Sequence, residues 1–66
     1  MTALNSSNLS GAEYDGGTLY IAFHGGRLYA YFGVPYSTFA GLLQANSHGE
    51  YFHAHIRNSY RYRRLR

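Results

Sequence analysis

Two short segments in the middle of the chain alternate apolar residues with polar or small ones. The first is Thr18–His24, in which one face carries Leu19, Ile21 and Phe23. The second is Arg27–Phe32, and only the pair Gly25-Gly26 separates it from the first. A period of two is that of a β-strand, whose successive side chains point to opposite faces. Because glycine adopts the positive φ angles that tight hairpins need, we expect two antiparallel strands joined by a short turn.

A third strand is expected just before this hairpin. The segment Ser7–Tyr14 reaches the turn-forming residues Asp15–Gly17, although Gly11 within it indicates a bulge or bend. Three strands joined by short turns make an antiparallel meander, so the first half of the chain is predicted to form a three-stranded sheet.

The second half of the chain carries the signals of two helices. Proline is tolerated in the first turn of a helix, and Pro35–Ala45 is predicted to be helical with one apolar face. Ser47 and Glu50 have the spacing of a capping box, which predicts a second, short helix that ends near Arg57. The predicted fold class is α+β, with the order β-β-β-α-α and both helices packed on one face of the meander.

The length of 66 residues is enough for one domain, spanning residues 1–66. At this size folding removes only about 60% of the accessible surface from water, and small domains compensate with disulfides, metals or oligomers. No cysteine is present, so a homo-oligomer is one possibility that stays open. Residues 1–6 lack the regions of a signal peptide and are expected to be loose. No apolar run approaches a membrane-spanning length, and we expect a cytoplasmic protein without a membrane partner.

The register of the Gly25-Gly26 hairpin decides the role of Tyr29 and Tyr31, and two registers are open. With a two-residue loop, both tyrosines belong to an exposed aromatic platform on which nucleic-acid bases could stack. The other members of that platform are Tyr20, His24 and Arg27. In this register the core consists of Leu19, Ile21, Phe23, Leu28 and Phe32. A three-residue loop with a bulge shifts the register by one residue and turns both tyrosines toward the helices.

Positive charge is concentrated at the C-terminal end. Residues 1–56 carry a net charge of −2, whereas the last ten residues hold five of the six arginines and the chain has no lysine. Arginine pairs bidentately with phosphate and also stacks on bases, so residues 58–66 form a basic segment suited to an anionic partner. The phosphate-binding candidates are Arg57, Arg61, Arg63 and Arg64. The stacking candidates are Tyr29, Tyr31, Tyr60 and Tyr62, and the secondary candidates are Arg27, Tyr20 and His55. The alternative is that Tyr60 and Tyr62 attach a solvated tail to the domain.

Neither a metal site nor a catalytic site is predicted. His53 and His55 are two positions apart, so on a helix they point about 200° apart and do not converge on one ion. The three carboxylates lie in separate segments, and no serine has the surroundings of a nucleophile. We expect a protein that is not an enzyme and that needs no cofactor or metal.

The order of these features resembles the KTSC domain, a short bacterial and phage module that also occurs at the C-terminus of some lysyl-tRNA synthetases. The resemblance covers 7–65. It rests on Ser7-Asn8, Tyr14-Asp15, the segment from Thr18 to His24, the run from Tyr29 to Pro35, Tyr51-Phe52, the run from His55 to Arg57, and Tyr60. Tyr29-Ala30-Tyr31 is similar to the YxY motif of the family. The resemblance implies no catalytic residue, and it suggests nucleic-acid binding.

Three functions are compatible with these observations. The leading hypothesis is a non-catalytic module that binds RNA or another nucleotidic, phosphate-bearing ligand through the basic segment and the tyrosines. The second, suggested by free-standing copies of the resembling domain in phages, is an oligomer that sequesters a small signalling nucleotide. The third is a protein-protein interaction module, because exposed tyrosine and arginine are common at interfaces.

Overall fold

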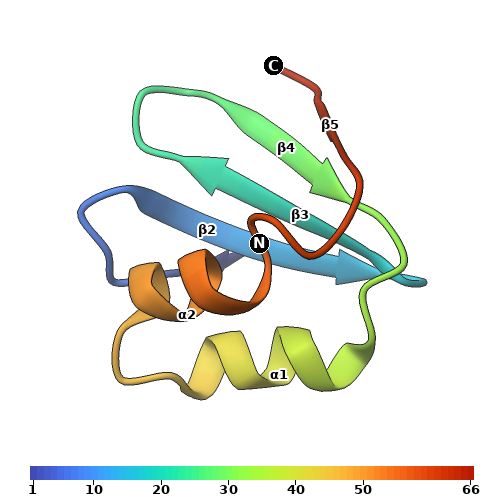
Figure 1. Ribbon diagram of the computed structural model, residues 1–66. Coiled ribbons are helices and arrows are strands. Elements are labelled where there is room, and N and C mark those ends of the chain that lie inside the picture. Colours follow the sequence, from blue (N-terminus) through green and yellow to red (C-terminus); the bar gives the residue numbers. More distant parts are fainter.

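The computed structural model describes all 66 residues as two layers, an antiparallel sheet and two helices on one of its faces (Figure 1). The strands are β1 (Thr2–Ala3), β2 (Leu9–Asp15), β3 (Thr18–Phe23), β4 (Leu28–Tyr31) and β5 (Tyr62–Arg64), and the helices are α1 (Tyr36–Gln44) and α2 (His48–His55). The α+β class and the two helices on one face agree with the sequence prediction. Strand order in the sheet follows the chain, β1-β2-β3-β4-β5.

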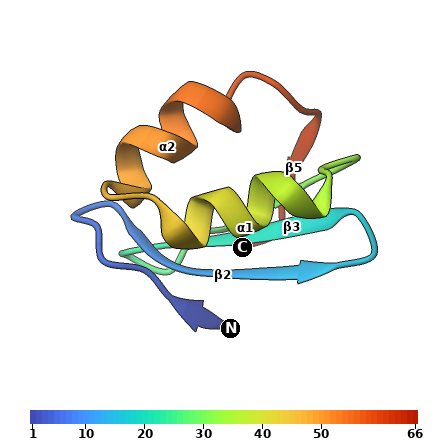
Figure 2. The same cartoon turned by 90° about the horizontal axis from the view of Figure 1, so that it is seen from below.

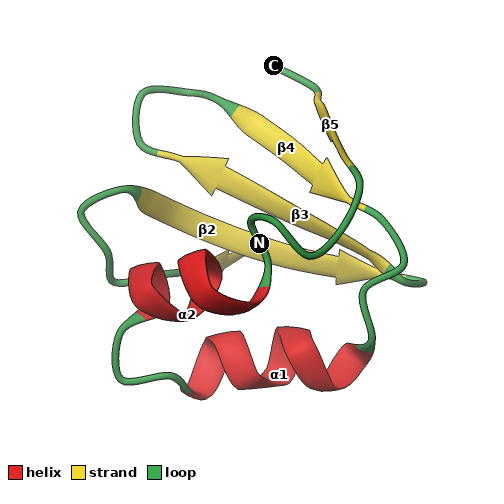
Figure 3. Ribbon diagram, in the orientation of Figure 1, coloured by secondary structure: helices red, strands yellow, loops and turns green.

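The sheet has five strands, and the prediction of three was wrong in this respect. The central meander β2-β3-β4 is the predicted one, and the additional strands lie at its two edges (Figure 3). β1 spans two residues and β5 three, so neither is long enough to show a period of two. Residues 1–6 were expected to be loose, but β1 pairs with β2 and Leu4 is buried in the core.

The β3–β4 hairpin adopts the register of a three-residue loop. Ala22 pairs with Leu28 and Leu19 pairs with Tyr31, which leaves residues 24–26 as the loop. Gly25 and Gly26 have φ angles of 98° and 95°, a region that residues with a Cβ rarely adopt. In this register Tyr29 and Tyr31 face the helices.

The consequence of this register appears at the end of β4. The two-residue register would place Phe32 in the core, yet Phe32 is 38% exposed, whereas Tyr31 is only 4% exposed. The exposed platform predicted for that register is therefore absent, and Tyr20 lies on the face of the sheet away from Tyr29 and Tyr31.

Each helix begins at a residue that the sequence identifies. Pro35 precedes α1 in an extended conformation, with φ −65° and ψ 149°. Ser47 caps α2, and its Oγ accepts a hydrogen bond from the Glu50 amide at 3.2 Å. The reciprocal bond of the predicted capping box, from the Ser47 amide to the Glu50 carboxylate, does not form.

The core lies between the sheet and the helices (Figure 2). Ile21 of β3, Leu42 of α1 and Ile56 after α2 are all 0% exposed, so each layer contributes fully buried side chains. Tyr14 stacks on Phe39 at 5.3 Å between ring centroids and donates a hydrogen bond to the Val34 carbonyl at 2.7 Å. These contacts attach the segment between sheet and helix to β2. Neither helix is long and apolar enough to cross a membrane.

Candidate ligand-binding pocket

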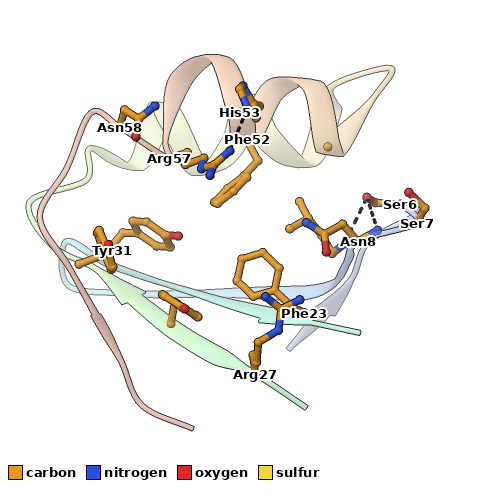
Figure 4. A pocket seen from close by; sticks show the side chains of 14 residues that line it. Ser6, Ser7, Asn8, Phe23, Arg27, Tyr31, Phe52, His53, Arg57 and Asn58 are labelled. Atoms are coloured by element: carbon orange, nitrogen blue, oxygen red, sulfur yellow. Dashed lines mark hydrogen bonds between the residues drawn. The ribbon is translucent and has the colours of Figure 1, made fainter. Parts of the chain in front are cut away.

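A pocket of about 470 Å³ opens between α2 and the helix-facing side of the sheet (Figure 4). It is lined by the loop before β2, the β3–β4 hairpin, α2 with the turn that follows it, and β5. The residues that line it are Ser6, Ser7, Asn8, Leu9, Phe23, Arg27, Tyr29, Tyr31, Gly49, Phe52, His53, Arg57, Asn58 and Tyr62. The volume is within the range of small-molecule sites in proteins.

The charge of the pocket is positive and uncompensated. Arg27 enters from the β3–β4 hairpin and Arg57 from the end of α2, while no aspartate or glutamate lines the pocket (Figure 4). The one ion pair in the structure joins the Met1 amine to Glu13, so neither guanidinium is neutralised within the chain. Two unpaired guanidiniums in one hollow favour an anionic ligand.

Both guanidiniums are held by neighbouring rings. The Arg27 Cζ lies 5.0 Å from the centroid of Phe23, in a cation–π contact. The Arg57 Nη1 donates a hydrogen bond to the His53 Nε2 at 3.0 Å, so this nitrogen of His53 carries no proton. These contacts restrict the two side chains in advance and lower the entropy cost of binding.

Aromatic rings form the wall of the pocket on the sheet side. Tyr29 and Tyr31 stack with centroids 6.4 Å apart, and the Tyr62 ring of β5 lies 5.8 Å from each of them. Phe52 of α2 contacts Tyr31 edge-on at 5.6 Å and Phe23 at 5.7 Å. Tyr62 is 59% exposed and is the member of this group with the most surface available for stacking.

Tyr31 presents its hydroxyl to the pocket. The residue is only 4% exposed, its hydroxyl points into the hollow, and no group of the protein forms a hydrogen bond with it (Figure 4). The pKa of Tyr31 is raised to about 12, mainly by burial and to a smaller extent by the neighbouring Tyr29 and Tyr62, while Arg57 acts in the opposite direction. The hydroxyl therefore keeps its proton at neutral pH and can donate a hydrogen bond to a ligand.

The loop before β2 supplies polar groups that the sequence analysis did not propose as ligand-binding. The Ser6 Oγ accepts hydrogen bonds from the amides of Asn8 and Leu9 at 3.1 and 3.2 Å, which shapes this loop at the mouth of the pocket. His53 and Asn58 were likewise missed. The Ser7-Asn8 pair could have pointed to this loop, because it is among the residues that carry the KTSC resemblance. No ligand-binding role was predicted for it.

The structure brings together five of the proposed site residues and separates the others. Those that line the pocket are Arg27, Arg57, Tyr29, Tyr31 and Tyr62. Arg61 and Arg63 lie beside Phe32 around a shallow hollow at the end of the sheet, and the Arg64 Nε donates to the Arg66 carbonyl at 3.2 Å.

The remaining candidates have structural surroundings. Tyr60 is half-buried against the core with its hydroxyl 3.3 Å from the Thr38 Oγ1, as expected for a residue that attaches the tail. The His55 ring contacts Tyr51 at 4.5 Å, outside the pocket. No group of three or more metal-ligating side chains is present.

Comparison with known proteins identifies the family and supports the fold. The family model of the KTSC domain matches residues 5–60. This chain belongs to the KTSC domain family. The crystal structure of the KTSC domain protein YPO2434 from Yersinia pestis is similar, with a TM-score of 0.90 and 28% sequence identity, over 98% of this chain and 94% of that one. No curated protein matches the sequence. The KTSC match ends before β5, so Tyr62 of the pocket lies outside the matched residues.

Proposed function

We propose that this KTSC domain is a non-catalytic module that binds a nucleotidic, phosphate-bearing ligand in the pocket between α2 and the sheet. One observation carries the proposal: two guanidiniums, those of Arg27 and Arg57, face an aromatic wall in a hollow that no carboxylate lines. Phosphate and base are the two chemical parts of a nucleotide, and this hollow offers a partner for each.

The parts of the pocket suggest how such a ligand would lie. Arg57 and Arg27 pair with phosphate oxygens, and the buried Tyr31 hydroxyl donates a further hydrogen bond between them. The exposed ring of Tyr62 offers a surface on which a base stacks, a contact that contributes about 1–3 kcal/mol per base. The other two tyrosines already contact rings of the protein, so they support Tyr62 more than they bind a base themselves.

The distribution of the remaining arginines favours a compact ligand over a long RNA. Arg61 and Arg63 lie around the shallow hollow beside Phe32, and neither lines the pocket. A strand of RNA that follows a backbone-binding groove needs a continuous basic track. A free nucleotide, a cyclic dinucleotide or the end of a single strand needs only the pocket.

The side chains of the pocket also support the non-catalytic part of the proposal. His53 is the one imidazole among them, and its Nε2 accepts from Arg57. No carboxylate or cysteine stands beside it to complete a nucleophile or an acid–base pair. The pocket can therefore recognise and retain an anion, which is a binding function.

A titration followed by NMR tests the proposal. The protein is titrated separately with a mononucleotide, a cyclic dinucleotide and a short single-stranded RNA, at low and at moderate salt. We expect saturable shifts at Arg27, Tyr31 and Arg57, which weaken as salt rises. Removal of a charge-assisted hydrogen bond costs about 1.5–3 kcal/mol, so Arg57→Gln should weaken binding roughly tenfold to a hundredfold.

Arg63→Gln is the matched control, because it removes the same charge from a residue that does not line the pocket. Binding should be nearly unchanged in this variant. Equal losses in R57Q and R63Q would contradict a pocket site and indicate general attraction to the charge of the protein. Absence of shifts with all three ligands would refute nucleotide binding and direct attention to a protein partner.

A further inference from the structure

The helices cover one face of the sheet and leave the other uncovered (Figure 2). Strand pairing places the side chains of this open face in rows that run across four strands. Backbone pairing defines the rows, because residues opposite each other on neighbouring strands point to the same face. One row consists of Glu13, Tyr20, Ala30 and Arg63. It begins with a carboxylate on β2 and ends with a guanidinium on β5.

A second row repeats this order of charges. Asp15 of β2 pairs with Thr18 of β3. Continuing the β3–β4 register by one residue places Phe32 opposite Thr18. The Phe32 amide in turn donates a hydrogen bond to the Arg61 carbonyl at 2.9 Å. The row consists of Asp15, Thr18, Phe32 and Arg61. The β2 side of the open face is therefore acidic, and the β5 side is basic.

Side-chain size also alternates between the two central strands. On β3 and β4, a large residue always lies beside a small one: Tyr20 beside Ala30, Phe32 beside Thr18, and Leu28 beside Ala22. The large residue is on β3 in the first row and on β4 in the other two. In each row of the open face, a projection on one of these strands therefore lies beside a depression on the other.

We infer that a second copy of this chain docks on the open face, related to the first by a two-fold axis that runs along the strands between β3 and β4. Rotation about this axis places β2 of one copy over β5 of the other, and β3 over β4. Each carboxylate then meets a guanidinium of the same row, Glu13 with Arg63 and Asp15 with Arg61. Each large side chain in the centre lies over a small one. An axis across the strands would place like charges together, so the charges select the first axis.

The surroundings of these residues agree with a partner of this kind. Phe32 and Leu65 are 38% and 46% exposed, and the sheet-to-sheet contact would cover both. Within one chain the only ion pair of Glu13 is with the Met1 amine, at 3.3 Å, and the arginines of β5 have no carboxylate partner. Four strands about 4.8 Å apart offer a small contact area, so the dimer belongs to the weak, reversible class. The ligand pocket opens on the other side of the sheet and stays free in the dimer.

Sedimentation equilibrium measures the assembly directly. The monomer has a mass of 7.5 kDa, and we expect the average mass to approach twice that value as the concentration rises toward millimolar. Added salt should shift the equilibrium back to the monomer, because exposed ion pairs are screened. A protein that remains monomeric at millimolar concentration at low salt would overturn the inference.

Charge reversal locates the contact. Arg63→Glu should raise the dissociation constant of the dimer by about tenfold or more, because it opposes Glu13 with a like charge. The matched control is Arg64→Glu, which makes the same charge change at the next residue, on the opposite face of β5. This control should dimerise like the unaltered protein. The double variant Glu13→Arg with Arg63→Glu exchanges the two charges and should restore the dimer.

Two results would overturn this arrangement even if a dimer forms. One is an equal effect of R63E and R64E, which would indicate overall charge as the cause. The other is a double variant that stays as weak as R63E although its NMR spectrum shows it to be folded, because the two charges would then not be in contact.

Discussion

The two faces of the sheet are built from the same strands, yet they differ in what supports them. On the helix side, Leu19 and Ile21 are 0% exposed and contribute to the core. On the open side, Tyr20 and Ala22 alternate with them and are only half-buried, because no helix covers this face. The comparison separates two roles: the covered face stabilises the monomer and forms the pocket, and the open face can change with little loss of stability.

Truncation of neighbouring residues of β3 tests the difference between the two faces most directly. Ile21→Ala leaves a cavity in the core and should lower the free energy of unfolding by about 2–5 kcal/mol. Tyr20→Ala removes a larger side chain from the open face, where cross-strand contacts contribute about 0.2–1 kcal/mol each. Urea unfolding at micromolar concentration, where the monomer prevails, measures both. Equal losses would show that the open face supports the monomer after all.

Alkaline pH provides a second test of the covered face. The pKa of Tyr31 is about 12 in the folded protein, against 10.0 for the unperturbed side chain, so above pH 10 the unfolded chain releases this proton first. The free energy of unfolding should fall as pH rises from 10 toward 12, by at most about 1.4 kcal/mol per pH unit. Below pH 10 this contribution is fully present. Tyr31→Phe should remove the Tyr31-dependent fall, whereas Tyr20→Phe on the open face should retain it.

The smallest of these effects concerns the cap of α2, which forms the upper wall of the pocket. Ser47→Ala removes the acceptor for the Glu50 amide and should cost about 1 kcal/mol of stability. Ser37→Ala, at an exposed position of α1 whose hydroxyl forms no hydrogen bond, is the control and should change stability by less than about 0.5 kcal/mol. If the rates of amide hydrogen exchange in α2 are the same in S47A as in the unaltered protein, the cap does not stabilise α2 as a wall of the pocket.

Much of the fold could be predicted because the local signals agreed with one another. The alternation in Thr18–Phe23, the proline before α1 and the serine before α2 each act through neighbouring residues, and the structure confirms all three. The short edge strands could not be predicted, because a strand of two or three residues is defined by the partner it pairs with and not by its own pattern.

The candidate site was less predictable, because it depends on one residue of register. The pair Gly25-Gly26 is compatible with a two-residue loop and with a three-residue loop that includes His24, and only packing against the helices selects the latter. The basic segment appeared in the sequence as one cluster of charge. In the structure the C-terminal arginines divide, because alternation along β5 sends Arg63 and Arg64 to opposite faces, and Arg57, which precedes the basic segment, is the only one of them that lines the pocket.

The alternation in β4 also limits how this protein can change during evolution. Its four residues serve both faces in turn, Leu28 and Ala30 on one and Tyr29 and Tyr31 on the other. Substitution at one position can therefore be tolerated without disturbing the opposite face. Insertion or deletion of a single codon within the strand would exchange the two sets of side chains, exposing the tyrosines and turning Leu28 and Ala30 toward the helices. We therefore expect the length of β4 to stay constant among homologues even where single residues of the strand are substituted.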